Sequence, residues 1–262
     1  RIDMQVLEFV QFGKNLIVHH KLSPDAFVQV AIQVAYYRLY KENVMTYETL
    51  MTKRFYHGRT EAGFIVTNES KELAASFEQE NQTVEELKQK IQKAIDATVK
   101  IVRLGNEGRG IRHLFALKCM AQQQASKDPE RQVPDLFSDE GWNFLHHHKI
   151  STSNCGNPAL RLFGFGPVAT DGFGIGYLIK DDNMQFCASS NGRQTGRLMA
   201  SFQQTLIDFA SVMEGRFQLG PRGQLSPMAT KRGSRPLGLQ AMNSFGGSYQ
   251  PSSSSPALHP QY

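Results

Sequence analysis

Cysteine and long apolar runs are both scarce in this sequence of 262 residues. The three cysteines, Cys119, Cys155 and Cys187, are scattered and lack Cys-x-x-Cys spacing, which argues against a disulfide framework or a zinc site and favours a reducing compartment. No apolar run approaches the roughly 20 residues that cross a bilayer, and the first residues lack the basic-then-apolar order of a signal peptide. The composition therefore predicts a soluble chain.

Acidic residues are absent after Glu214, although the whole chain carries a formal net charge of +5. Five of the 29 basic residues follow that position, so 24 basic residues balance 24 acidic ones in the rest of the chain. Gly, Pro, Ser and Gln dominate from about residue 215, a composition that buries too little apolar surface to offset its chain entropy. We therefore expect a folded domain over 1–214 and a disordered basic tail over 215–262. A solvated extension is favoured over contact with an acidic surface or membrane headgroups, and no nucleic-acid binding is expected.

The folded part mixes helical and strand patterns. The opening stretch alternates like a strand inside a sheet, and Ser23-Pro24-Asp25 begins a helix that is apolar on nearly every side and therefore buried. A capping box at 83–86 opens an amphipathic helix, which the glycine-rich loop 105–110 ends before a second helix over 111–124. Strands are predicted at 149–153, 161–165, 173–180 and 184–190, and a last helix at 193–213. This order predicts a layered α/β or α+β fold.

Three segments depart from what a core alone requires. Segment 46–61 interleaves hydroxyl and cationic side chains, which suits either an anion site or an exposed polar strand and turn. Strand alternation places Ser151 and Ser153 on one face and Thr152 on the other, so the two serines could hold a carboxylate or donate to an oxyanion, although such tripeptides are common in ordinary strands. Segment 161–182 alternates glycine with aromatics, which indicates a bulge or a close approach of another backbone or a ligand.

These segments together resemble the carnitine/choline acyltransferase family over residues 7–214. The resemblance is carried, in order, by LSPDAFVQVAIQVAYYRLY, TYET with HGRTE, RHLFALK, and ISTS with FGFGPVATDGFGIGY. It implies a chloramphenicol-acetyltransferase-like C-terminal domain of a two-domain enzyme, an α/β (α+β layered) fold with a mixed sheet and flanking helices. Such an enzyme moves an acyl group between coenzyme A (CoA) and carnitine, with acetyl-CoA or CoA as co-substrate and without a metal or a tightly bound cofactor.

The resemblance also implies contacts for carnitine. The matching positions are Tyr47, Thr49, Thr60, Arg112, Ser151 and Phe165. Arg112 would supply most of the charge recognition of the carboxylate, and the ring of Phe165 would lie beside the trimethylammonium group. Ser153 would face the oxyanion. Thr60 and Arg112 favour carnitine over choline, which has no carboxylate, while Ile111 stands where the family usually has an acid.

For CoA, the resemblance points to the helix start and to one strand end. The matching positions are Lys14, Lys21, Leu22, Ser23, Pro24, Asp25 and Asn154. Lysines in this segment would bind the 3′-phosphate. Val18 stands where the family has a second lysine, and Lys21 or His20 would compensate for that missing lysine.

The acyl pocket is expected at Phe163. Long-chain members of the family have glycine at the aligned position, which opens a channel for the acyl tail, so a phenylalanine predicts acetyl or another short acyl group. A medium-chain or long-chain carnitine acyltransferase is the alternative within the family.

A catalytic histidine is missing. The family places its general base in a Glu-His…Asp-Gly motif that this sequence lacks, while His57 and His113 match positions that the family treats as structural, and the run 146–148 is predicted to be exposed. Because the chain begins with arginine directly before a strand pattern, we expect a piece of a longer protein, inactive without the missing N-terminal domain. The full-length protein is predicted to be a monomer. A noncatalytic binding module of the same fold is the alternative, and the C-terminus lacks a peroxisomal signal, which leaves a cytoplasmic or mitochondrial location open.

Overall fold

A six-stranded mixed sheet forms the centre of the computed structural model, which describes residues 1–79, 81–157 and 159–218. The strands lie in the order β1 (Asp3–Phe9), β6 (Met184–Ser190), β5 (Phe173–Ile179), β4 (Ile150–Asn154), β2 (Thr46–Met51) and β3 (Thr60–Phe64). Strand β4 pairs in parallel with β2 and β5, and the other pairs are antiparallel. The predicted mixed sheet with flanking helices is confirmed.

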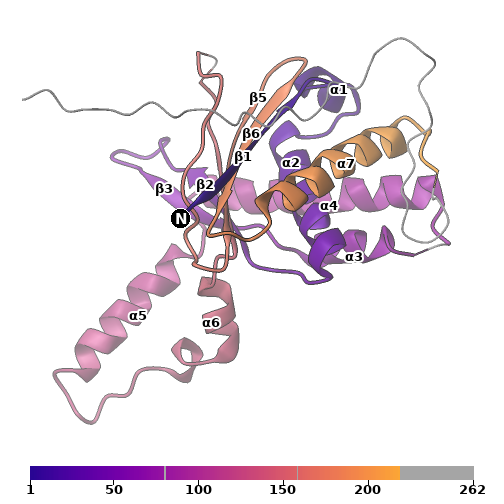
Figure 1. The fold of residues 1–262 in the computed structure, drawn as a ribbon. Coiled ribbons are helices and arrows are strands. Elements are labelled where there is room, and N and C mark those ends of the chain that lie inside the picture. The colour runs from indigo at the N-terminus through magenta and orange to yellow at the C-terminus, as the bar shows by residue number, and fades with distance from the viewer. Residues whose placement is uncertain (80, 158, 219–262) are drawn as a thin grey trace, which may run out of the picture. The chain divides into compact units, whose positions relative to one another are not determined.

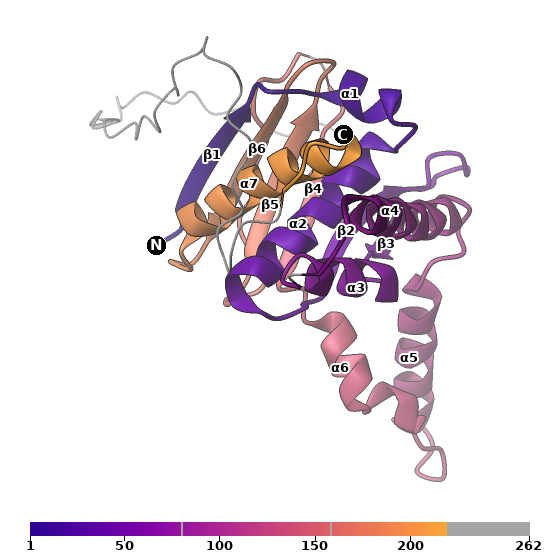
Figure 2. The same cartoon turned by 90° about the vertical axis from the view of Figure 1, so that its right-hand side faces the viewer.

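Helices cover one face of this sheet, which we call the helix face (Figures 1 and 2). They are α2 (Pro24–Tyr40), α4 (Val84–Asn106) and α7 (Thr195–Met213), with α3 (Asn68–Ser76) packed on α2 and α4 and the short α1 (Lys14–His19) beside α2. Helices α5 (Arg112–Ala125) and α6 (Glu140–His146) and the 3-10 turn η1 (Asp135–Phe137) extend away from the sheet (Figure 1). Among the described residues no helix is long and apolar enough to span a bilayer.

Helix α2 is buried along most of its length, as its sequence predicts. Ser23 accepts a hydrogen bond from the backbone N–H of Ala26, and Pro24 occupies the first helical position, so the helix begins where these residues indicate. The ring of Phe27 meets Phe209 of α7 edge-on at 5.4 Å between centroids. Phe217 is also buried, so core packing reaches past residue 214, while residues 219–262 of the expected tail lie outside the described part.

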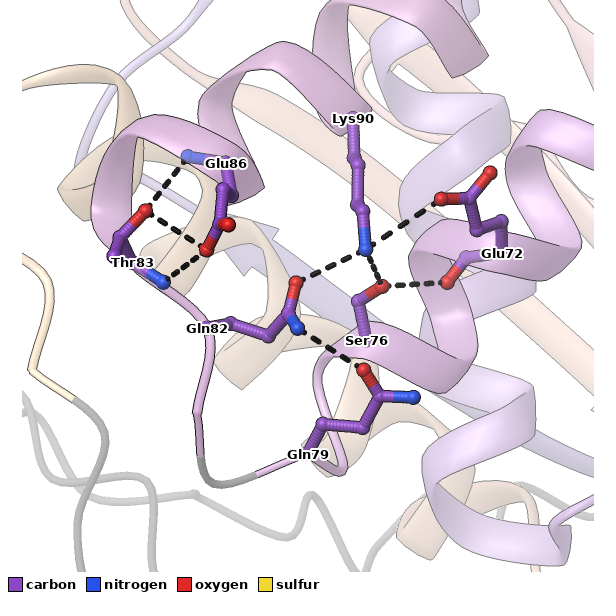
Figure 3. A network of polar contacts seen from close by, with 7 residues as sticks. All are labelled: Glu72, Ser76, Gln79, Gln82, Thr83, Glu86 and Lys90. Carbon is purple, nitrogen blue, oxygen red and sulfur yellow. Dashed lines mark hydrogen bonds and ion pairs between the residues drawn. The ribbon is translucent and has the colours of Figure 1, made fainter.

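Helix α4 begins at the predicted capping box. Thr83 and Glu86 exchange hydrogen bonds, and Lys90, one turn further on, contacts Ser76 and Glu72 of α3 (Figure 3). The helix ends at Asn106, one residue past the start of the loop that the sequence predicts. Gly105 can remain helical there because its missing side chain leaves room for Leu50 of β2.

Segment 161–165 is not a strand, which corrects the prediction. It crosses the other face of the sheet, which we call the loop face, and its backbone lies directly on β5. A Cβ atom on Gly174 would lie 2.9 Å from the carbonyl oxygen of Phe165, and one on Gly176 would lie 2.9 Å from the Phe163 carbonyl carbon. The glycines therefore record a close approach of two backbones, the second of the two meanings that the sequence allowed.

The first strand and several short helices also differ from the sequence pattern. Strand β1 lies at the edge of the sheet rather than inside it, and its side chains Met4 and Val6 are exposed. Helices α1, α3 and α6 were not predicted, because each has only six to nine residues. Helix α3 nevertheless has a capping box, formed by Thr67 and Ser70.

A buried ion pair joins α2 to α7. The guanidinium of Arg38 lies 2.6 Å from the carboxylate of Asp208, with side chains 7% and 2% exposed, and also contacts the ring face of Phe77. Burial opposes both charges, because it lowers the pKa of Arg38 and raises the pKa of Asp208. Such a pair contributes little relative to an apolar pair but is costly to break.

Replacing Asp208 by alanine is therefore expected to lower the free energy of unfolding by about 3–5 kcal/mol, because the buried guanidinium loses its counter-charge. Urea denaturation measures the change. The matched control is Glu78→Ala, which removes the exposed partner of Lys41 and should cost no more than about 1 kcal/mol. Equal losses in the two variants would contradict the assignment.

Gly174→Ala is expected to lower the free energy of unfolding by about 1–3 kcal/mol, since the new methyl group would lie 2.7 Å from the backbone oxygen of Gly166 and must displace that segment. Gly196→Ala serves as the control. It lies in the first turn of α7, where the nearest atom to an added Cβ is 3.9 Å away and where alanine is the better helix former. A variant at Gly174 as stable as the control would show that the crossing segment does not rest on β5.

Candidate functional site

The faces of β4 carry two different sets of candidate residues. On the helix face, the Oγ1 atom of Thr152 accepts a hydrogen bond from the amide of Gln29 at 2.8 Å and donates to the carbonyl of Tyr47 at 2.8 Å. Strand alternation then places Ser151 and Ser153 on the loop face, as the sequence indicates. The site is therefore built around one strand with a polar row on each side.

Four of the predicted carnitine residues share the loop face. Tyr47 pairs with Ser151 across β2 and β4, Thr49 follows two residues along β2, and Thr60 pairs with Met51 across β2 and β3, on the same face. Ser151 is only 2% exposed, and its hydroxyl has no hydrogen-bond partner among the described residues. A buried hydroxyl without a partner is unfavourable until a water or a ligand completes its bonding.

The crossing segment brings two phenylalanines beside the serines. Gly174, which pairs with Ser151, lies under the backbone of Phe165, and Gly176, which pairs with Ser153, lies under that of Phe163. The two rings are 6.1 Å apart and half-buried. The carbonyl of Phe165 accepts a hydrogen bond from Ser189 at 2.5 Å, which fixes the segment on the sheet.

The ring of Tyr47 packs on a histidine. His148 lies 5.2 Å from Tyr47 and 5.2 Å from Phe64, measured between ring centroids, and His146 packs on Trp142. Burial, reinforced by the charges of His146 and His147, lowers the pKa of His148. The run 146–148 was expected to be exposed, but only His147 is, and the described residues contain no group of histidine, cysteine and carboxylate side chains suited to a metal.

Arg112 lies at the start of α5, where it contacts a carboxylate that the sequence did not reveal. Glu61, which is 5% exposed, accepts a hydrogen bond from the backbone N–H of Arg112 at 3.2 Å, and the guanidinium lies 3.8 Å from the same oxygen. Glu61, the last residue of the HGRTE segment, therefore contacts both the backbone and the side chain of Arg112. The described contacts of Arg112 lead to Glu61 and to none of the other carnitine candidates, and its side chain is 52% exposed.

Two of the predicted CoA residues meet at the junction of β4 and α2. The amide of Asn154 donates to Oδ1 of Asp25 at 2.8 Å. Between α1 and α2 the chain turns through Leu22, which is buried in the core, while Ser23 and Pro24 begin the helix. The side chain of Leu22 is therefore part of the core, while those of Ser23 and Pro24 are half-buried at the start of the helix.

The basic residues near α1 differ in availability. The ammonium of Lys14 is paired at 2.7 Å with Asp181, in the turn between β5 and β6, which no motif indicated. Lys21 adopts a left-handed conformation just after α1 and is exposed. Burial, with the charges of His19 and Lys88, lowers the pKa of His20.

A buried tyrosine joins Asp25 to a second carboxyl group. The hydroxyl of Tyr177 lies 2.7 Å from Oδ1 of Asp25 and 3.3 Å from Oε1 of Glu48, and it accepts a hydrogen bond from the amide of Gln29 at 2.8 Å. Burial, followed by the charge of Asp25, raises the pKa of Glu48 to about 9. Sequence reasoning missed Glu48, because an acid in an alternating strand ordinarily faces solvent.

Known proteins share much of this sequence. Residues 1–208 match the family model described as choline/carnitine O-acyltransferase. A Saccharomyces cerevisiae protein named "Putative mitochondrial carnitine O-acetyltransferase" is 40% identical over 210 residues, which cover 79% of this chain and 30% of that protein. Human mitochondrial carnitine O-palmitoyltransferase 2 is 32% identical over 219 residues, covering 82% of this chain and 32% of the relative. Carnitine O-acetyltransferase of Columba livia is 31% identical, covering 81% and 34%.

The extent of these matches fits the structure. The chain spans about 30% of the length of the first of these relatives, and the region that matches the family model includes the whole sheet and most of α7. A family match of this length, with a relative 40% identical over most of the chain, shows the family directly. The chain belongs to the choline/carnitine O-acyltransferase family.

Proposed function

We propose that the full-length protein containing this chain transfers an acyl group between CoA and the hydroxyl of carnitine. The observation that carries the proposal is that β4 contributes residues to both proposed binding regions. Its loop face presents Ser151 and Ser153 beside Tyr47, and its end presents Asn154 bonded to Asp25 at the start of α2. Two substrates could thus approach one strand from two sides. The names of the relatives, carnitine O-acetyltransferase and carnitine O-palmitoyltransferase, support the same reaction class.

On the loop face, carnitine would bind through complementary charges and hydrogen bonds. The hydroxyls of Tyr47, Thr49, Thr60 and Ser151 would bind its carboxylate together with the half-exposed guanidinium of Arg112. The ring of Phe165 would contact the trimethylammonium group by cation–π attraction. Ser153, beside Gly176 and the Phe163 backbone, would donate to the oxyanion that develops during transfer.

CoA would bind as a co-substrate at the opposite end of the site. Asp25 and Asn154 would contact polar groups of the ligand, while Lys14 and Lys21 would attract its phosphate groups. The backbone from Lys21 to Asp25, including Leu22, Ser23 and Pro24, would line the approach. Because Lys14 is already paired with Asp181, its contribution depends on exchanging that carboxylate for a phosphate.

Among the described residues, no hydrogen bond joins Ser151 or Ser153 to a histidine that could act as the general base. His57 lies at the tip of the β2–β3 hairpin, where it has a positive φ of 59° and packs on Tyr56, and His113 contacts the carbonyl of Gly110. Both contacts are local and structural. The base and the rest of the site would then belong to another domain of the same protein, and this chain alone would be inactive.

The role of Arg112 can be tested in the full-length protein. Arg112→Ala is expected to raise KM for carnitine about 10- to 100-fold, because a charge-assisted hydrogen bond contributes roughly 1.5–3 kcal/mol, with little change in KM for acetyl-CoA. Arg109→Ala, which removes a nearby exposed arginine paired with Glu107, is the control and should stay within about threefold of the parent.

Several outcomes would count against the proposal. An unchanged KM for carnitine in Arg112→Ala would exclude the predicted carboxylate contact. Transfer by the 262-residue chain at the rate of the full-length protein would contradict an outside base. A full-length protein without transfer from acetyl-CoA or palmitoyl-CoA to carnitine would favour a noncatalytic binding module.

The acyl group is proposed to be short, acetyl in particular. Phe163 belongs to the crossing segment, and its backbone lies on Gly176, which pairs with Ser153. Its ring would close the space that a longer acyl tail needs. Phe163→Gly is expected to raise kcat/KM for octanoyl-CoA at least tenfold relative to acetyl-CoA, measured as a chain-length series on the full-length protein. Leu160→Gly, just before the crossing segment, is the control. A Phe163→Gly variant without a gain on longer chains would contradict the acetyl assignment.

A further inference from the structure

Two carboxyl groups contact one tyrosine hydroxyl on the helix face of the sheet. Glu48 on β2 is 3% exposed and Tyr177 on β5 is fully buried, whereas Asp25 in the first turn of α2 is half-buried. The Tyr177 oxygen lies 2.7 Å from Asp25, 3.3 Å from Glu48 and 2.8 Å from the amide of Gln29. Because this hydroxyl has a single proton, only one of the two carboxyl groups can accept a hydrogen bond from it.

Counting donors and acceptors assigns the protons. A tyrosine hydroxyl donates once and can accept twice. Its proton goes to Asp25, the shorter contact, and one acceptor position is taken by the N–H of Gln29. The remaining position faces Glu48, which can bond there only if it carries a proton to donate. An ionised Glu48 would instead direct a buried negative charge at an oxygen lone pair.

The surrounding charges favour the same assignment. The titratable groups that face Glu48 are Asp25 and Tyr177, and Gln29 is the other polar neighbour, so the described residues place no cation against it. Asp25 differs, because it lies at the N-terminus of α2, where the helix dipole favours negative charge, and receives the amide of Asn154. One proton is thus held by Glu48, and one negative charge stays on Asp25.

We propose that Glu48 is a neutral acid at physiological pH and acts through Tyr177 as a positioning residue for Asp25 and Asn154. This inference rests on the proposed CoA contact of those two residues. Every described hydrogen bond of Asp25 uses Oδ1, which leaves Oδ2 to accept from an N–H or O–H group of the ligand. Fixing Oδ1 from two sides orients the whole carboxylate, so Glu48 influences CoA affinity without touching CoA.

Binding of CoA to the full-length protein, measured by calorimetry, tests the positioning role. Glu48→Gln keeps a neutral donor toward Tyr177 and should bind CoA within about threefold of the parent at pH 7. Glu48→Leu removes the donor and should bind about tenfold more weakly. Between pH 7 and pH 9.5 the parent's affinity should fall about threefold relative to that of Glu48→Gln, because with a pKa of about 9 only about a quarter of the parent keeps the Glu48 proton at pH 9.5. Comparing the two proteins at the same pH cancels the titration of CoA itself.

The protonation of Glu48 is read separately, without CoA. Its carboxyl ¹³C resonance, assigned by its loss in Glu48→Gln, should titrate near the folded-state pKa of about 9 rather than near 4.5. Since the unfolded chain loses this proton first, the parent's stability should fall as pH rises between these values relative to that of Glu48→Gln. The Tm of Glu48→Gln minus the Tm of the parent should therefore rise steadily from pH 5 to pH 9.

The possible results distinguish the positioning role of Glu48 from the proposed CoA site. A Glu48 resonance that titrates near 4.5, or a Glu48→Gln variant as weak as Glu48→Leu at pH 7, would overturn the inference. Should Glu48→Leu fail to fold, the comparison of the parent with Glu48→Gln across pH still decides. A parent protein that does not bind CoA at any pH would contradict the proposed CoA site and the positioning role together. The resonance would then still decide the protonation.

Discussion

The side-chain amide of Gln29 is the contact on which the geometry of the site depends. It is fully buried on α2, and its nitrogen donates at 2.8 Å both to Thr152 of β4 and to the hydroxyl of Tyr177 on β5. An amide with both protons bonded fixes the rotation of the helix relative to two strands. That rotation sets the position of Asp25 one turn earlier, so the start of α2 meets the end of β4.

The same contact explains why the two sets of candidate residues stay separate. Because Thr152 is held on the helix face, its neighbours Ser151 and Ser153 must face the other way. Thr152 also donates to the carbonyl of Tyr47, which ties β2 to β4 where the proposed carnitine residues lie. A continuous chain of hydrogen bonds therefore runs from Asn154 and Asp25, the proposed CoA contacts, through buried side chains to the backbone of Tyr47, and so connects the two proposed sites.

Features encoded within a few residues were predictable from the sequence, and contacts between distant segments were not. The start of α2 at Ser23, the capping box at Thr83 and the two faces around Thr152 follow from local rules, and the structure agrees with all three. The crossing segment 161–165 was wrongly predicted as a strand, because a loop that packs on a sheet can have the same apolar pattern as a strand that pairs within it. Glu48 and Glu61 were missed because burial of an acid depends on which distant donor meets it.

Two of the polar groups that local packing leaves incomplete are proposed ligand contacts. The buried hydroxyl of Ser151 has no partner among the described residues, and the guanidinium of Arg112 reaches Glu61 only at 3.8 Å while half exposed. By contrast, Arg38 pairs closely with Asp208, as a structural charge does. The hydroxyls of Thr152 and Tyr177 on the helix face are hydrogen-bonded, whereas that of Ser151 on the loop face keeps its bonding capacity. That capacity, more than the sheet itself, indicates where carnitine would bind.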